Sequence, residues 1–175
     1  MSIKKLSLVI LGTICANLVF ADLPPEVIGS CKQHKAVSTS VTFTNIDPPE
    51  GLGDDEPGCL NHAESTVNSF NYGSIICNDE NYLILKGSRI NLNTAQNHSV
   101  NPSISPGADI APGSDWSKIA FNNIDYLCIS TPLSPSGAGA SVEQYYIVEN
   151  AYNTSTPIIH YYFFDKDIMP MADTN

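Results

Sequence analysis

Short β-prone runs alternate along this chain with segments rich in proline, glycine, serine and asparagine. This alternation constrains the fold more than any other feature, because glycine and proline interrupt regular structure and runs of about four to eight β-branched and aromatic residues have the usual length of strands. Several such runs in succession, with little helical periodicity, favour an antiparallel sandwich or a small barrel. The sequence therefore predicts a mainly β fold with long loops.

The clearest local pattern is a set of three β-prone runs separated by two turns. Residues 72–77 and 82–86 are strand-like, and residues 78–81 between them have the composition of a turn. Gly87 and Ser88 form a two-residue connection suited to a hairpin, since glycine tolerates a positive φ. The returning strand would then cover residues 89–92. These runs predict a three-stranded antiparallel meander.

Other runs extend this pattern over the rest of the chain. Residues 158–164 are apolar on both faces, which predicts a central strand covered on both sides, or a strand whose outer face meets a partner. Further strands are expected at residues 36–45, 119–121, 124–130 and 142–149, and loops at residues 47–58, 93–117 and 131–141. Residues 22–26 are expected to form an extended lead-in, and residues 169–175 a flexible tail.

The first 21 residues have the composition of a secretory signal peptide. Lys4 and Lys5 precede a compact apolar run at residues 6–20, and cleavage is expected near Ala21. No second apolar run approaches the length of a membrane span. The sequence thus predicts one β-rich domain, residues 22–175, that is secreted or periplasmic and has no membrane span after cleavage.

Charge argues against some classes of partner. The first 21 residues carry two of the eight basic residues and no acidic one, so residues 22–175 have a net charge of −12. The remaining basic residues are scattered along the sequence and form no stripe. Binding to nucleic acid or to an anionic membrane surface is therefore disfavoured.

Four cysteines remain in the expected mature chain, namely Cys31, Cys59, Cys77 and Cys128. An even number in an exported protein indicates two disulfides, with three alternative connectivities. Cys77 and Cys128 lie in apolar strand-like runs, whereas Cys31 and Cys59 lie in polar segments. Similar surroundings favour the pairs 31–59 and 77–128.

Two C-x-x-H segments offer an alternative use for two of these cysteines. Cys31 with His34, and Cys59 with His62, would supply two thiolates and two imidazoles, a set that zinc binds tetrahedrally. In an oxidising compartment the thiols would form disulfides first, which favours the bridges over zinc. The acidic loop at residues 47–56 could gather oxygen ligands for calcium, but it lacks the spacing of a dedicated calcium loop.

No sequence signature of catalysis is found, so binding is favoured over enzymatic activity. The predicted function is that of a small exported binding protein whose partner is an unknown protein or glycan. The long loops at residues 93–117 and 131–141 are the expected surfaces, with four tyrosines as aromatic contacts: Tyr145, Tyr146, Tyr161 and Tyr162.

Two alternative functions remain open at this point. One is a secreted hydrolase whose site is dispersed in sequence around a histidine, and the other is metal or metal-cofactor binding through the C-x-x-H segments. His160 lies in an apolar strand and is expected to be a core histidine. Asn97 and Asn153 match the glycosylation pattern, which matters only in a eukaryotic secretory route.

Overall fold

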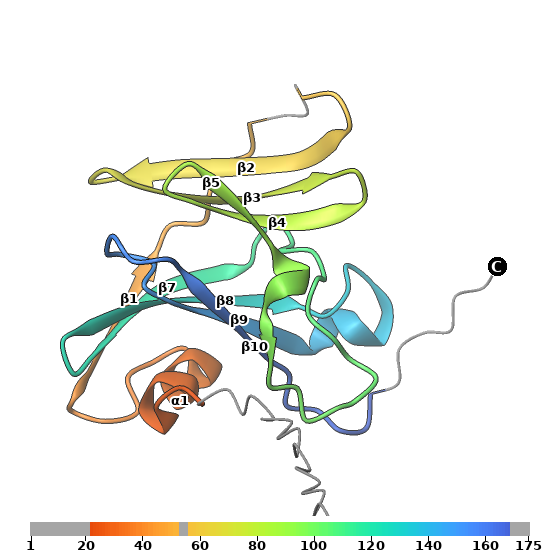
Figure 1. The fold of residues 1–175 in the computed structure, drawn as a ribbon. Coiled ribbons are helices and arrows are strands. Elements are labelled where there is room, and N and C mark those ends of the chain that lie inside the picture. Colours follow the sequence, from red (N-terminus) through yellow and green to blue (C-terminus); the bar gives the residue numbers. More distant parts are fainter. Residues whose placement is uncertain (1–21, 53–55, 169–175) are drawn as a thin grey trace, which may run out of the picture.

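The computed structural model describes residues 22–52 and 56–168 of the 175-residue chain. The expected signal peptide at residues 1–21 and the expected tail at residues 169–175 lie outside the described residues, so both stay predictions. Within the described residues the chain forms two β-sheets and one α-helix, stacked as three layers (Figure 1). The mainly β fold is confirmed, and the sheets form a sandwich-like pair rather than a closed barrel.

The larger sheet has six strands. In spatial order these are β1 (Val41–Ile46), β7 (Asp115–Phe121), β8 (Ile124–Pro132), β9 (Glu143–Glu149), β10 (Ile158–Tyr162) and β6 (Gln96–Asn97). All neighbours are antiparallel except β10 and β6, which run parallel. Two short 3-10 helices, η1 (Leu92–Thr94) and η2 (Gly137–Ser141), lie in the connections.

The smaller sheet is one continuous antiparallel stretch of chain. It contains β2 (Cys59–Val67), β3 (Phe70–Cys77), β4 (Glu80–Leu85) and β5 (Ser88–Asn91) in that order. The predicted meander is therefore confirmed as β3, β4 and β5. The turn into β5 lies one residue earlier than expected: Lys86 and Gly87 both have positive φ, as a type I′ turn requires, and Ser88 already pairs with β4.

Two hydrophobic layers hold the fold together. Along β8, Leu127 and Ile129 pack between the two sheets, whereas Tyr126 and Cys128 pack against the helix α1 (Pro25–Gln33). Both faces of the larger sheet are thus covered, which explains why its central strands are continuously apolar. The strand predicted at residues 158–164 is β10, which has a neighbour on each side and is buried over residues 159–162.

The helix α1 was not expected. The two prolines at residues 24–25 suggested an extended lead-in, but Pro25 is the first helical residue, a position where a missing N–H costs no hydrogen bond. Val27 and Cys31 are one helical turn apart and face the larger sheet. The helix ends at His34, which has left-handed φ and donates its N–H to the carbonyl of Cys31.

Strand β2 was also missed, because it is polar and irregular. Its pairing with β3 shifts between Leu60 and Ala63, and Asn61 in this bulge has positive φ. The extra residue interrupts the alternation that reveals a strand in sequence. Further along, β2 passes so close to Gly73 of β3 that a Cβ there would lie 2.1 Å from the carbonyl oxygen of Ala63.

The expected disulfide pairing was wrong. Cys31 is bonded to Cys128, and Cys59 to Cys77. Cys59 and Cys77 are directly opposite each other on β2 and β3, and Cys31 lies on the buried side of α1 above β8. The polar segment around Cys31 was misleading, because only one side of a helix needs to be apolar.

Candidate functional site

The four tyrosines predicted to contact a partner belong to the core. Tyr146 and Tyr161 are fully buried between the sheets, and Tyr145 and Tyr162 are at most 6% exposed on the α1 side. The phenol of Tyr161 donates a hydrogen bond to Oε1 of Gln144 (3.0 Å). Burial raises the pKa of all four phenols, that of Tyr162 to about 12. This prediction of binding residues was wrong, because large aromatic side chains in strands covered on both faces fill the interior.

The structure does not bring the two C-x-x-H segments together. Cys31 and Cys59 belong to different disulfides, on α1 and on the smaller sheet. The tetrahedral zinc set is therefore not assembled. The calcium prediction for residues 47–56 is not tested, since residues 53–55 lie outside the described part.

His34, one of the predicted metal ligands, instead contacts two carboxylates at the end of α1. Its Nε2 lies 3.2 Å from Oε2 of Glu143, and its Nδ1 lies 3.5 Å from Oδ2 of Asp115. Desolvation opposes the charge of Glu143, but hydrogen bonds from Tyr145 and His34 outweigh it and lower the pKa of this carboxyl. Because each ring nitrogen faces a different carboxylate, these contacts connect the end of α1 to the first residues of β7 and β9.

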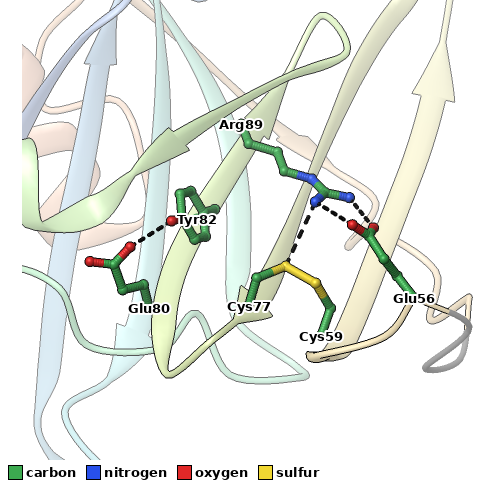
Figure 2. Close-up of a disulfide and its surroundings, with 6 residues drawn as sticks. All are labelled: Glu56, Cys59, Cys77, Glu80, Tyr82 and Arg89. Carbon is green, nitrogen blue, oxygen red and sulfur yellow. Dashed lines mark hydrogen bonds and ion pairs between the residues drawn. A yellow bond between two sulfur atoms is a disulfide. The ribbon is translucent and has the colours of Figure 1, made fainter.

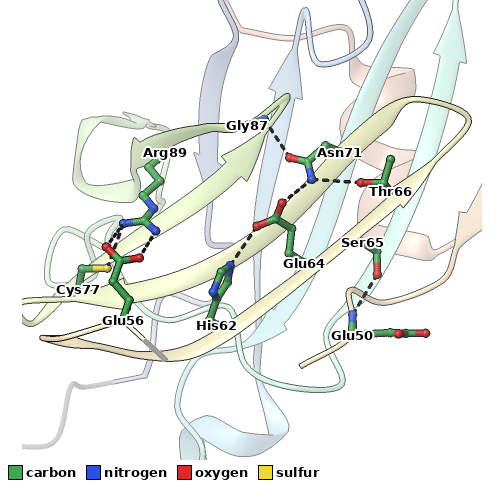
Figure 3. Close-up of polar contacts among 10 residues, drawn as sticks. All are labelled: Glu50, Glu56, His62, Glu64, Ser65, Thr66, Asn71, Cys77, Gly87 and Arg89. Carbon is green, nitrogen blue, oxygen red and sulfur yellow. Dashed lines mark hydrogen bonds and ion pairs between the residues drawn. The ribbon is translucent and has the colours of Figure 1, made fainter. Parts of the chain in front are cut away.

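His62, the other predicted histidine ligand, takes part in a hydrogen-bonded chain on the smaller sheet (Figure 3). Its Nε2 lies 3.0 Å from Oε2 of Glu64, whose other oxygen accepts a hydrogen bond from Nδ2 of Asn71 (2.6 Å). The hydrogen bond from Asn71, followed by that from His62, lowers the pKa of Glu64. Nearby, Arg89 forms an ion pair with Glu56 through both terminal nitrogens.

His98 and His160 form a second chain of polar contacts, beside α1. Nδ1 of His98 lies 2.7 Å from Oδ1 of Asp22, and its Nε2 lies 3.1 Å from Nδ1 of His160. His160 is 3% exposed, and burial together with the adjacent His98 lowers its pKa to about 4. Its buried place in β10 agrees with the prediction of a core histidine. Among the described residues no histidine hydrogen-bonds a serine or cysteine, but His34, His62 and His98 each contact a carboxylate. The alternative of a hydrolase with a dispersed site therefore stays a prediction.

A cleft of about 300 Å³ opens between the two sheets at one end of the sandwich. Its walls are mainly apolar, and one of the polar residues that line it is a serine from β3. The residues that give it this character are Pro48, Pro49, Ile110, Pro112, Trp116 and Ser74. Trp116 is the only tryptophan of the chain. The Ser74 hydroxyl has no hydrogen-bond partner among the described residues, although Ser74 is mostly buried.

The rim on the side of the smaller sheet is held by backbone hydrogen bonds. Residues 50–52 run alongside β2, where the N–H of Leu52 donates to the carbonyl of His62 and the N–H of Glu64 donates to the carbonyl of Glu50, both at 2.8 Å. Gly51 forms a bridge with Ala63 at this point. This segment is therefore paired with β2 beside its bulge, and Pro48 and Pro49, which precede it, line one wall of the cleft.

The opposite rim is the segment of residues 107–114, which is fixed by side chains of the larger sheet. The phenol of Tyr146 accepts a hydrogen bond from the N–H of Gly107 and donates one to the carbonyl of Ala108. Oγ1 of Thr131 accepts a hydrogen bond from the N–H of Ala111 (3.0 Å). Both rims are thus fixed by hydrogen bonds within the protein, as in binding sites that are largely preformed.

Sequence reasoning missed this cleft except for one signal. The loop at residues 93–117 was expected to carry a binding surface, and it does contribute residues 110–113 to the lining. The loop at residues 131–141 does not line the cleft. Trp116 also falls within residues 93–117 but lies on β7. The remaining walls come from residues 48–51, from the unexpected strand β2 and from Ser74 of β3, whose proximity could not be inferred from their positions in the sequence.

Comparison with protein families, with curated proteins and with solved structures finds no match to this chain. No helix among the described residues is long and apolar enough to cross a membrane. What can be said about function therefore depends on the geometry of the chain itself.

Proposed function

We propose that this protein is an exported binding protein whose cleft takes a small, mostly apolar ring that carries one hydrogen-bonding group. The observation that carries the proposal is the combination in one cleft of apolar walls, Trp116 and the unpartnered hydroxyl of Ser74. A hydroxyl that has no partner within the protein can donate one hydrogen bond to a ligand or accept one from it. The volume of about 300 Å³ is at the lower end for small-molecule sites, which fits a single ring.

Export is part of the same proposal. Two disulfides within one small domain are typical of proteins that fold in an oxidising compartment. The apolar run at residues 6–20 would direct the chain there. A ring of the proposed kind could belong to a free metabolite or to a side chain displayed by a partner protein, and the chemistry of the cleft is the same in both cases.

The single tryptophan makes the proposal directly testable, because the indole N–H of Trp116 gives one distinct NMR resonance. We expect p-cresol, which carries a ring and a hydroxyl, to shift this resonance in a saturable manner. Ser74→Ala should weaken the binding of p-cresol but not that of toluene, which cannot form the hydrogen bond. The loss should be about fivefold to tenfold, corresponding to a net hydrogen bond of about 1 to 1.5 kcal/mol.

A substitution that fills the cleft provides the second arm of the test. Ala111→Phe places a ring on the cleft wall and should abolish the shift. Ala138→Phe, in the exposed helix η2, is the matched control and should leave binding unchanged. Equal binding by the wild type and Ala111→Phe would contradict the proposal, as would the absence of any saturable shift at Trp116.

A further inference from the structure

The two disulfides lie in very different surroundings. Cys31 and Cys128 are at most 2% exposed, within the apolar layer between α1 and the larger sheet. The bridge between Cys59 and Cys77 joins the first residue of β2 to the last residue of β3 (Figure 2), and the burial of Cys59 is only partial. Thiol exchange requires access to the sulfur that is attacked. Only the bridge between Cys59 and Cys77 offers such access, at Cys59.

A guanidinium distinguishes the two sulfurs of this exposed bridge. Nη1 of Arg89, on β5, lies 3.7 Å from Sγ of Cys77 and is within reach of a hydrogen bond to it. Glu56 holds the guanidinium in this position through both of its carboxylate oxygens, as Figure 2 shows. A cation beside a cysteine lowers the pKa of its thiol and stabilises the thiolate. The contact with Arg89 therefore favours Cys77 as the leaving group, while a carboxylate oxygen of Glu56 lies within 4.8 Å of both sulfurs.

The exposure of the attacked sulfur and the positive charge beside the leaving sulfur favour the same direction of reaction. Cys59 is the more exposed sulfur, and Cys77, at 7% exposure, is the sulfur that Arg89 contacts. An incoming thiolate attacks one sulfur while the other departs, and a leaving thiol of lower pKa departs faster. Attack at Cys59 with release of Cys77 satisfies both requirements, whereas the reverse direction satisfies neither.

We propose that Cys59 is a site of S-thiolation, at which a low-molecular-weight thiol exchanges with the disulfide to Cys77. The sulfur of the incoming thiolate forms a new S–S bond with Sγ of Cys59. The bond between Cys59 and Cys77 breaks, and its electron pair goes to Sγ of Cys77, which becomes a thiolate facing the N–H of Arg89. One disulfide is replaced by another, so the step requires no separate oxidant or reductant.

The proposed exchange does not rest on the binding proposed for the cleft, although the two sites are close along the chain. Asn61 and His62, which line the cleft, follow Cys59 on β2. The remainder of the hairpin is held by pairs that extend from Ala63 with Ser74 to Val67 with Phe70. Opening the bridge therefore releases the start of β2 without removing the rest of its pairing.

The test uses the folded full chain and glutathione as the thiol. Aliquots are quenched with iodoacetamide, which alkylates free thiols, and the cysteine peptides are mapped by mass spectrometry without reduction. We expect glutathione on Cys59, an alkyl group on Cys77, and an intact bond between Cys31 and Cys128. The reverse placement of the two groups on Cys59 and Cys77 would overturn the proposal, and so would equal rates of opening at the two disulfides.

Variants of Arg89 test the role of the guanidinium. Arg89→Gln should slow the exchange by at least about threefold, because loss of the guanidinium raises the pKa of the leaving thiol and a thiol of higher pKa departs more slowly. Arg89→Lys keeps the positive charge and should retain most of the rate. Lys118→Gln is the matched control, because Lys118 is also paired with a carboxylate, that of Asp125 (2.6 Å), but lies on the larger sheet.

An unchanged rate of exchange in Arg89→Gln would overturn the proposed role of the guanidinium. A rate that is slowed equally in Lys118→Gln would also overturn it, because the net charge of the protein and not the contact with Cys77 would then control the exchange. If Arg89→Gln does not fold, the position of glutathione on the wild-type protein still decides the proposal, since attack at Cys59 is its central claim.

Discussion

Removing the disulfide between Cys31 and Cys128 should destabilise this protein more than removing the one between Cys59 and Cys77. The first joins residues 97 positions apart and the second residues 18 positions apart. A cross-link restricts the unfolded chain, and the restriction grows with the logarithm of the loop that it closes. The loop-closure relation gives about 4.7 kcal/mol for the long loop and about 3.2 kcal/mol for the short one.

The double variants Cys31→Ala/Cys128→Ala and Cys59→Ala/Cys77→Ala make the comparison direct, because the same atoms are removed in each. Urea unfolding is followed by the fluorescence of Trp116, which is 3% exposed in the folded protein. The free energy of unfolding should fall further in the first variant, by about 1.5 kcal/mol relative to the second. Burial of Cys31 and Cys128 adds to this difference, because their loss leaves a small cavity in the core.

Far-UV circular dichroism in the absence of urea serves as the control that both variants are folded. Equal losses, or a greater loss in the variant that lacks Cys59 and Cys77, would refute the argument from loop length. Such a result would mean that local packing in the β2–β3 hairpin matters more than the restriction of the unfolded chain.

Three further predictions follow from single contacts. Gly73→Ala should lower the free energy of unfolding by at least about 2 kcal/mol, because a Cβ there would meet the backbone of β2. A Cβ at Gly51 would have nothing within 4 Å, so Gly51→Ala should change the free energy of unfolding by less than about 0.5 kcal/mol in the same urea assay. Similar losses in the two variants would contradict the close approach of β2 to Gly73. His160 has a pKa of about 4 in the folded protein and about 6.5 when unfolded, so the unfolded chain binds the extra proton and stability falls as the pH decreases between these values. Between about pH 7.5 and about pH 4.5, the free energy of unfolding measured in urea should fall by about 2 to 3 kcal/mol less in His160→Gln than in the wild type. Parallel pH profiles of the two proteins would refute this role of His160. Tyr72→Phe should cost about 1 to 2 kcal/mol by thermal or urea unfolding, because the hydroxyl donates a hydrogen bond to the carbonyl of Asp47 (2.8 Å), and an unchanged stability would exclude a role for this bond.

The features that sequence predicted well are local ones. The meander of β3, β4 and β5 depends on two turns whose residues adopt positive φ, namely Asn78, Asp79, Lys86 and Gly87. Asparagine, aspartate and glycine adopt this conformation more readily than other residues, so their presence in the sequence predicts such turns. The continuous apolar run of β10 indicated a strand covered on both sides, because its composition reflects burial directly.

The features that sequence missed depend on how segments meet in space. The disulfide between Cys31 and Cys128 requires a helix whose start was hidden by two prolines, and the one between Cys59 and Cys77 requires the register of a bulged, polar strand. Tyr145 and Tyr162 were assigned to a surface because α1, which covers them, was not expected, whereas Tyr146 and Tyr161 are covered by the smaller sheet. The cleft is made by segments that approach only when both sheets have formed, so no single segment carries its pattern.

The smaller sheet consists wholly of consecutive strands, β2 to β5, while β1 and β7, which flank it in the sequence, pair with each other. The smaller sheet can therefore be assembled through short loops, whereas the pairing of β1 with β7 must first close a loop that contains that sheet. We expect the bridge between Cys59 and Cys77 to form early in oxidative folding. The bond between Cys31 and Cys128 should form last, when α1 docks on the completed larger sheet. The order in which the two disulfides form would then follow from the topology of the chain.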